Sequence, residues 1–306
     1  MAAELNAAQA ALAQVATDPG AKKPDPIIVG SGITRTFGGL KAVDVEHIEI
    51  QRGVITALIG PNGAGKTTLF NLLTGFDEPD TGEWSFNGRS LQNVAAFKVA
   101  RLGMVRTFQL TKVLSKLTVI QNMLLGATDQ KGEKFWLAPF KWLWSGQEAE
   151  NTARADDLLA RFKLDAKRED FAGSLSGGQR KLLEMARALM VDPELIMLDE
   201  PMAGVNPALK QSLLGHVQSL RDEGRTVLFV EHDMDMVRDI ADWVIVMAQG
   251  TVVAEGPPHE VMANPAVIDA YLGSHHDAPL TEEDEAEQLA AAEAELDAEL
   301  DQHRKA

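Results

Sequence analysis

The chain has 306 residues, which suits one large α/β domain or two small ones with a buried core. It contains no cysteine, so disulfides, thiol catalysis and cysteine-ligated metals are excluded, and a reducing compartment fits. The formal net charge of −16 argues against a general nucleic-acid binder, so we expect no nucleic-acid partner. Between positions 274 and 306, eleven acidic residues face only Arg304 and Lys305, so more than half of this charge lies in the C-terminal tail.

No segment has the length and apolarity of a membrane-spanning helix. The most apolar-looking window, Phe135–Trp144, is too short for a bilayer and contains Lys141. The N-terminal segment is rich in alanine but lacks a basic leader followed by an apolar core, so it does not resemble a secretory signal. The sequence therefore predicts a soluble, cytoplasmic chain.

The first part of the chain is expected to be a flexible extension followed by strands. Residues 1–26 form the extension, because Asp18–Pro26 is rich in residues that break helices and strands. Short apolar runs then indicate strands at Ile27–Val29, Val43–Ile50 and Val54–Ile59. Thr67–Thr74 has a helical pattern closed by Gly75.

Further along, a helical stretch separates two groups of strands. Glu83–Phe86 is predicted to be a strand ended by the turn Asn87–Gly88, and Asn93–Leu102 is predicted to be a helix. From about 110 to 187 the pattern is mostly helical. Strand-like apolar runs return at Leu195–Leu198, Thr226–Val230 and Val244–Met247. We therefore expect a core formed by residues 27–107 and 187–274, a helical subdomain at 108–186, and an acidic tail at 275–306.

A phosphate-binding pattern, Gly60-x4-Gly65-Lys66-Thr67, follows a predicted strand and opens a predicted helix, which is the context such a loop needs. Glycines let the backbone approach an anion, and the helix N-terminus adds a favourable dipole. We expect Lys66 to reach the β- and γ-phosphates and the Thr67 hydroxyl to bind Mg²⁺. The predicted nucleotide-binding residues are Gly60, Pro61, Asn62, Gly63, Ala64, Gly65, Lys66, Thr67 and Thr68.

Two acidic residues and a histidine follow later strands. Asp199 ends an apolar run, which places it at the C-terminal end of a buried strand, where α/β sheets bind ligands and a carboxylate can hold Mg²⁺. Glu200 is the candidate general base for an attacking water. His232 also follows an apolar strand, and we predict that it contacts the γ-phosphate, because a neutral imidazole can donate one hydrogen bond and accept another. A lone histidine is otherwise more often an ordinary surface or core residue. With Lys66, Glu200 and His232 belong to the predicted catalytic set, and Asp199 is a predicted metal ligand.

The string Leu175-Ser176-Gly177-Gly178-Gln179 is expected to form a turn that caps the helix Gln179–Met190. With the phosphate-binding loop and the acidic pair, it resembles the signature of ABC transporter ATP-binding subunits over about residues 27–273. The resemblance implies an α/β P-loop NTPase (RecA-like) core with an antiparallel β subdomain and a helical insertion subdomain, using ATP and Mg²⁺. It also implies a head-to-tail pair of ATP-binding subunits, identical or paralogous, in which Ser176, Gly177, Gly178 and Gln179 face the γ-phosphate on the other subunit.

The resemblance assigns two further residues. Gln109, in Arg106-Thr-Phe-Gln, resembles the glutamine that touches Mg²⁺ and links the core to the helical insertion, and it joins the catalytic set and the metal ligands. Phe37 resembles the aromatic residue that stacks on adenine, and a core aromatic of a β-sheet is the alternative.

Four segments resemble the subgroup for branched-chain amino acids and related amides or urea, namely Gly38–Ala42, Leu73–Phe76, Ala203–Pro207 and Glu255–Gly273. Two positions depart from the patterns: the family usually has Asp where this chain has Asn206, and the subgroup often has Tyr-Gly-Asp-Gln where this chain has Ser176-Gly-Gly-Gln. The resemblance implies an ATP-hydrolysing subunit that powers uptake. Such a subunit is peripheral on the cytoplasmic face of the inner membrane, with transmembrane permease subunits and a solute-binding protein as partners. The ATPase of a lipid or polysaccharide exporter and a soluble non-transport ABC ATPase are the alternatives.

Two segments have open roles. Phe135–Trp144 holds three tryptophans, and it could dock on a membrane subunit or fill the small core of the helical insertion. The acidic tail brings Leu289, Leu296 and Leu300 near one helical face. It could therefore be a helix that binds a basic partner or a solvated tail.

Overall fold

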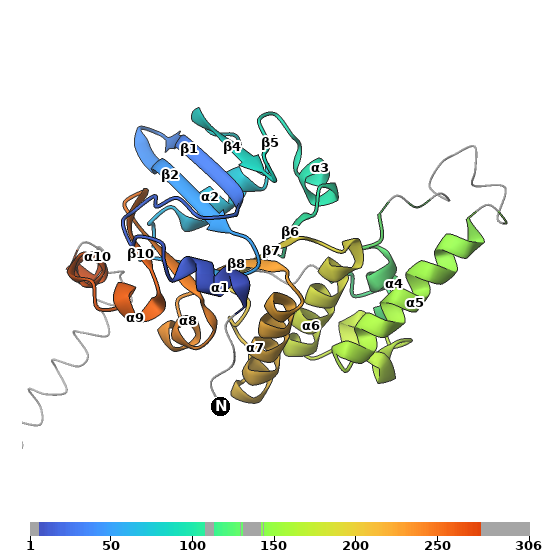
Figure 1. Ribbon diagram of the computed structural model, residues 1–306. Helices are drawn as coiled ribbons and strands as arrows, with labels where there is room; N and C mark the ends of the chain where they lie inside the picture. The colour runs from blue at the N-terminus through green and yellow to red at the C-terminus, as the bar shows by residue number, and fades with distance from the viewer. Residues whose placement is uncertain (1–5, 108–112, 129, 131–141, 143, 277–306) are drawn as a thin grey trace, which may run out of the picture.

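The computed structural model describes residues 6–107, 113–128, 130, 142 and 144–276. The predicted site residue Gln109, most of Phe135–Trp144 and the acidic tail from 277 onward lie outside these ranges. Figure 1 shows two β-sheets, with most of the helices on the side of the larger sheet that faces away from the smaller one. Within the described ranges, no helix combines the length and the apolar character needed to cross a membrane.

The smaller sheet is antiparallel, in the order β2-β1-β4-β5. Its strands are β1 (Pro26–Phe37), β2 (Leu40–Gln51), β4 (Thr81–Phe86) and β5 (Arg89–Ser90). Gly38 and Gly39 join β1 to β2, Asn87 and Gly88 join β4 to β5, and all four residues have positive φ. Two-residue turns of this kind match the twist of the flanking strands, and the predicted turn at Asn87–Gly88 is confirmed.

The larger sheet has the order β10-β9-β3-β8-β7-β6 and is parallel except for its β10 edge. Its strands are β3 (Ile55–Ile59), β6 (Met104–Arg106), β7 (Leu195–Asp199), β8 (Thr226–Val230), β9 (Trp243–Ala248) and β10 (Thr251–Gly256). Every residue of β3, β7 and β8 is buried, as expected for a parallel sheet covered on both faces. The carboxyl ends of these three neighbouring strands meet at one edge, where Gly60, Glu200 and Glu231 follow them.

Helices cover both faces of the larger sheet. On the side of the antiparallel sheet lie α2 (Lys66–Leu73) and α3 (Ala96–Arg101). The opposite side carries α4 (Val119–Leu124), α5 (Ser145–Arg161), α6 (Gly177–Ala188), α7 (Pro207–Asp222), α8 (Met234–Ile240), α9 (Pro258–Val261) and α10 (Pro265–His276). Short 3-10 helices occupy Asp165–Lys167, Ala172–Ser174 and Leu189–Val191. α4, α5 and α6 contact one another and form a helical group, on the right of Figure 1.

The alternation of side chains along β3 divides the core in two. Ile55, Ala57 and Ile59 belong to the apolar cluster that includes α4 to α8. Leu58, and Val54 directly before the strand, belong to the cluster that includes α2 and the antiparallel sheet. Because successive side chains of a strand point to opposite faces, β3 holds the two halves of the molecule together, and its carboxyl end is a rigid base for the loop that follows.

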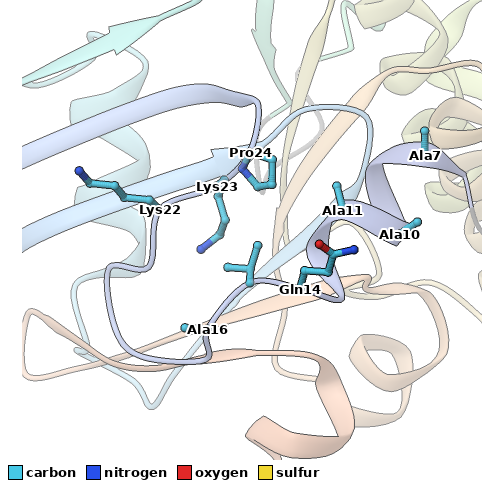
Figure 2. A pocket seen from close by; sticks show the side chains of 9 residues that line it. Ala7, Ala10, Ala11, Gln14, Ala16, Lys22, Lys23 and Pro24 are labelled. Carbon is cyan, nitrogen blue, oxygen red and sulfur yellow. The ribbon is translucent and has the colours of Figure 1, made fainter.

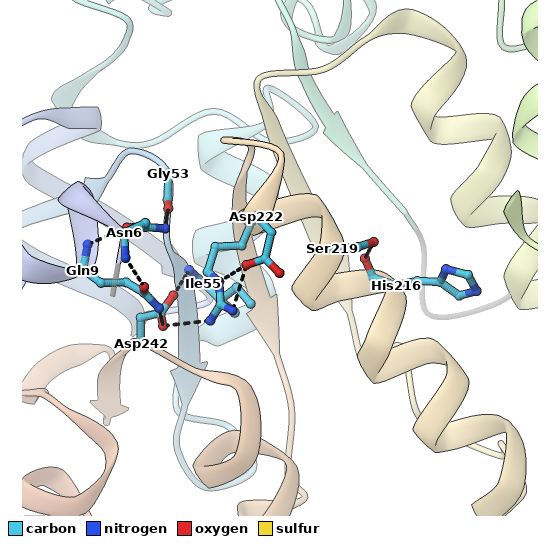
Figure 3. A network of polar contacts seen from close by, with 9 residues as sticks. Asn6, Gln9, Gly53, Ile55, His216, Ser219, Asp222 and Asp242 are labelled. Atoms are coloured by element: carbon cyan, nitrogen blue, oxygen red, sulfur yellow. Dashed lines mark hydrogen bonds and ion pairs between the residues drawn. The ribbon is translucent and has the colours of Figure 1, made fainter. Parts of the chain in front are cut away.

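Residues 6–26 are docked on this core, which differs from the flexible extension expected over 1–26. The helix α1 (Ala7–Leu12) starts with a capping box between Asn6 and Gln9. The side-chain amide of Asn6 donates to the Gly53 carbonyl at 3.3 Å, and that of Gln9 donates to Asp242 at 2.6 Å (Figure 3). These contacts join α1 to the edge of the larger sheet opposite the carboxyl ends of its strands.

A buried ion pair fixes the other end of this N-terminal segment. Lys23 Nζ lies 2.7 Å from Glu255 Oε2, and the two side chains are 1% and 2% exposed. Glu255 also accepts from the Trp243 indole N–H at 2.8 Å and from the Ala21 backbone N–H at 2.6 Å. Figure 2 shows an open hollow between the two anchors, with walls from α1 and from Lys22–Pro24.

Candidate nucleotide-hydrolysis site

The loop Gly60–Gly65 connects the end of β3 to the start of α2, and its conformation requires glycine at both ends. Gly60 and Gly65 have φ values of 149° and 95°. A Cβ atom would lie 2.1 Å from the Met247 carbonyl oxygen at Gly60, and 2.2 Å from the Ala42 carbonyl oxygen at Gly65. The backbone is therefore held against β2 and β9, and a side chain at either position would displace it.

The Lys66 side chain reaches back to the first two residues of this loop. Its Nζ donates to the carbonyl oxygens of Gly60 at 2.6 Å and Pro61 at 2.9 Å. Burial lowers the pKa of the Lys66 ammonium, and the negative charges of Glu200 and Asp199 oppose this shift. The structure thus brings the predicted lysine close to both predicted acidic residues.

Asp199 is the last residue of β7 and is almost fully buried. Its Oδ2 lies 2.7 Å from Nη2 of Arg106, the last residue of β6. Arg106 could not be singled out from the sequence, because nothing in the chain pattern shows that β6 and β7 are paired.

Glu200 sits in a strained turn beside His232. Its φ is 46°, in the left-handed region that residues other than glycine rarely adopt. Its backbone N–H donates to the Val230 carbonyl at 3.0 Å, which fixes the turn against β8. His232 Nε2 lies 2.9 Å from Glu200 Oε1, so the predicted base and the predicted phosphate-contacting histidine share a hydrogen bond.

Two charged residues that the sequence did not assign support this turn. Lys181, on α6, donates to the carbonyl oxygens of Glu200 at 3.3 Å and Pro201 at 3.0 Å. The buried Glu231 accepts from the Met202 backbone N–H at 2.8 Å and from the His232 backbone N–H at 3.2 Å. Burial raises the pKa of Glu231, although both backbone N–H groups favour its ionised form. In the sequence, the only indication of a role for Glu231 is its position directly before His232.

A tyrosine of the C-terminal helix approaches the loop from another direction. Tyr271, on α10, packs against the apolar cluster that contains β9. Burial raises the pKa of its phenol to about 12, and the Gly60 backbone N–H acts in the opposite direction.

The signature string begins a helix, as predicted. Ser176 caps α6: its Oγ accepts from the Gln179 backbone N–H at 3.2 Å, and Gln179 Oε1 accepts from the Ser176 backbone N–H at 3.0 Å. A Cβ at Gly178 would lie 1.8 Å from Leu209 Cδ2, whereas one at Gly177 would meet nothing within 4 Å. Across the described chain, no hydrogen bond or ion pair joins Ser176–Gln179 to Gly60–Thr68, so the structure does not bring these two motifs together.

Two remaining predicted residues have separate positions. Phe37, at the end of β1, is 48% exposed, with the Arg35 guanidinium 4.8 Å from its ring centroid. The alternative of a core aromatic is therefore wrong. Asn206 caps α7, because its Oδ1 accepts from the Leu209 backbone N–H at 2.9 Å.

The donors near the loop suit Mg²⁺ bound together with a nucleotide. Thr67 is exposed on the first turn of α2, and Asp199 supplies a carboxylate. In the described ranges, no group of three or more His, Cys, Asp or Glu residues could hold a metal by itself. Mg²⁺ does not need such a group, because it commonly takes one or two protein ligands and completes its shell with phosphates and water.

A clamped glycine loop, a buried lysine and an acidic pair at the end of a neighbouring parallel strand define a P-loop nucleotide hydrolase. The ABC transporter family model matches residues 43–203. A second model, described as branched-chain amino acid ATP-binding cassette transporter, matches residues 251–277.

Curated relatives and solved structures agree with these matches. The "probable branched-chain amino acid transport ATP-binding protein LivG" of Archaeoglobus fulgidus is 41% identical over 248 residues, which cover 81% of this chain and 96% of the relative. The high-affinity branched-chain amino acid transport ATP-binding protein BraF of Pseudomonas aeruginosa is 40% identical over 250 residues, covering 81% and 98%. A crystal structure of the ADP conformation of an ATP-binding cassette is similar, with a TM-score of 0.71, 38% identity and coverage of 81% and 99%.

The chain therefore belongs to the ABC transporter family of ATP-binding subunits, and it hydrolyses ATP as the motor of such a transporter. The predicted fold, a P-loop NTPase core with an antiparallel β subdomain and a helical subdomain, is confirmed. About a fifth of the chain lies outside the match to these relatives.

Proposed function

We propose that this ATPase subunit powers the uptake of branched-chain amino acids or a related amide or urea. The match of residues 251–277 to the branched-chain amino acid cassette model supports this substrate class, as do the names of the relatives. The partners are transmembrane permease subunits, a solute-binding protein and a second ATP-binding subunit. The chain then works at the cytoplasmic face of the inner membrane.

The chemistry that we propose centres on Glu200. Its carboxylate takes a proton from the water that attacks the γ-phosphate, and His232 orients both the carboxylate and the phosphate. The 2.9 Å contact between Glu200 and His232, beside the buried Lys66, is the observation that carries this proposal. Lys66 stabilises the charge that develops on the phosphates.

The nucleotide is held mainly by backbone groups. The N–H groups of Gly60–Gly65 and the N-terminus of α2 surround the phosphates, and Phe37 stacks on the base from the end of β1. Mg²⁺, when bound, neutralises charge on the β- and γ-phosphates; Thr67, Asp199 and Gln109 are its proposed protein ligands.

We propose that Ser176–Gln179 serves the site of a neighbouring ATP-binding subunit. The open space around Gly177 and the lack of contact with this chain's own phosphate-binding loop among the described residues support this role. The N-terminus of α6 then supplies fixed N–H donors to a γ-phosphate on the partner. The helical group α4–α6 fits a subdomain at 108–186 that is distinct from the core at 27–107 and 187–274.

The transport assignment is tested by purifying the tagged chain in mild detergent and identifying the membrane subunits that co-purify. The complex, in proteoliposomes with its solute-binding protein, should show ATP-dependent uptake of leucine, isoleucine or valine, or of urea or a short amide. Recovery of no membrane subunit would favour the soluble ATPase, and ATP-dependent outward movement of a lipid would favour the exporter.

A further inference from the structure

A buried arginine connects the two halves of the proposed metal site. Arg106 Nη2 lies 2.7 Å from Asp199 Oδ2, with side chains that are 6% and 5% exposed. Arg106 Nη1 donates to Asn71 Oδ1 at 2.6 Å, and its guanidinium lies 5.5 Å from the Phe70 ring centroid. One guanidinium thus joins the ends of β6 and β7 to α2.

The geometry places this connection between Asp199 and Thr67, two of the protein ligands proposed above. Asn71 is four residues after Thr67 on α2, so the two side chains lie on the same face of the helix, one turn apart. Asp199 has two carboxylate oxygens. Arg106 binds Oδ2, while Oδ1 makes no hydrogen bond within the described chain. Arg106 therefore fixes the carboxylate by one oxygen and leaves the other open.

A purely structural role would not need such a pair. The cost of desolvating two charges offsets most of their attraction. A buried ion pair therefore often stabilises a fold less than apolar residues of similar volume would. Groups that hold a ligating carboxylate, in contrast, set its orientation toward the metal.

We propose that Arg106 is a positioning residue for Mg²⁺: it orients Asp199 and ties that carboxylate to the helix that carries Thr67. This inference rests on the proposed role of Asp199 as a metal ligand. Arg106 itself touches neither the metal nor the nucleotide. It acts through Asp199 and Asn71.

The test measures metal binding rather than turnover. Purified Arg106→Met and wild-type protein are titrated with a fluorescent ATP analogue in EDTA, and then with Mn²⁺ in the presence of ATP, followed by electron paramagnetic resonance. We expect affinity for the metal-free nucleotide to change by less than about threefold, because the loop backbone and Lys66 are intact. Affinity for Mn²⁺ should fall about 10–100-fold, the usual cost of removing a group that orients a metal ligand.

Three further variants separate the explanations. Asn71→Ala keeps both charges of the pair and removes only the link to α2, so it should weaken Mn²⁺ binding by a smaller factor and stay folded. Arg161→Met, which breaks the Arg161–Glu223 pair far from the loop, is the matched control and should leave Mn²⁺ affinity unchanged. Asp199→Asn, as a single substitution, should weaken Mn²⁺ binding.

The outcomes are distinguishable. If Asp199→Asn weakens Mn²⁺ binding but Arg106→Met and Asn71→Ala do not, the positioning role is wrong and the proposed metal ligand stands. If Asp199→Asn also leaves Mn²⁺ affinity unchanged, the proposed metal site itself is wrong. If Arg106→Met fails to fold, Asn71→Ala decides, because unchanged Mn²⁺ affinity in that variant overturns the inference.

Discussion

Replacing Lys23 with methionine removes one charge of the buried pair that fixes the N-terminal segment. The Lys23 side chain is 1% exposed, and its ammonium donates to Glu255 and to the Ala21 carbonyl. Methionine has a similar length and no charge, so the change leaves the Glu255 carboxylate buried with two N–H donors, from Ala21 and Trp243.

The cost follows from this geometry. Removing one partner of a buried ion pair costs about 3–5 kcal/mol, and the two remaining donors to Glu255 place this variant at about 3 kcal/mol. For a domain of this size, 1 kcal/mol lowers the melting temperature by roughly 2–4 °C, so the expected loss is roughly 6–12 °C. Differential scanning calorimetry of the purified chain measures it.

Lys22 offers a matched control, because it is exposed and makes no ion pair within the described residues. Lys22→Met should melt within about 1 °C of the wild type, since surface substitutions usually change stability by less than 0.5 kcal/mol or so. If Lys23→Met has the same melting temperature as the Lys22→Met control, the N-terminal segment is not docked. Residues 6–26 would then be the flexible extension expected from their composition.

Three other predictions concern single residues. Phe37→Ala should weaken ATP binding by about 0.5–1.5 kcal/mol through lost stacking. It should leave the melting temperature unchanged, since the ring is half exposed. Unchanged ATP affinity, measured by isothermal titration calorimetry, would exclude the stacking role. Gly177→Asp should keep the melting temperature, because a side chain there meets nothing within 4 Å and an acidic residue suits a helix N-terminus. It should nevertheless abolish ATP hydrolysis, because the new carboxylate repels the γ-phosphate bound on the partner subunit. Normal hydrolysis would contradict the proposed role of Ser176–Gln179 across the dimer. Burial raises the pKa of Glu231, so the unfolding free energy of the wild type relative to Glu231→Gln should fall as pH rises from about 4.3 through the raised pKa. Urea unfolding of both proteins at several pH values measures this difference in unfolding free energy. A difference that stays constant with pH would show that the pKa of the carboxyl is not raised.

The motifs with a fixed local context were predictable from the sequence. Gly60–Thr68 and Ser176–Gln179 are each defined by the backbone conformation that their own residues adopt, a clamped loop and a capped helix. Asp199 and Glu200 were predictable because an apolar run ending in two acids specifies a buried strand and its carboxyl end.

Residues whose roles depend on distant partners were not predictable in the same way. Arg106 and Asp199 are 93 positions apart, and only the pairing of β6 with β7 joins them. Lys23 and Glu255 are 232 positions apart, and a Pro- and Gly-rich neighbourhood gave no sign that Lys23 is buried. Composition reports the local preference of a segment, whereas docking depends on the surface that the rest of the chain presents.

The central claim is that Glu200 is the base of an ATP-hydrolysing site. The most direct measurement is the steady-state rate of phosphate release by Glu200→Gln, with ATP affinity measured on the same sample and Lys66→Ala as the variant that loses nucleotide binding. Our account predicts a rate lowered about 10²–10⁴-fold with ATP affinity retained, since glutamine keeps the shape and the hydrogen bond to His232 but cannot take a proton. A Glu200→Gln protein that hydrolyses ATP at the wild-type rate would contradict it.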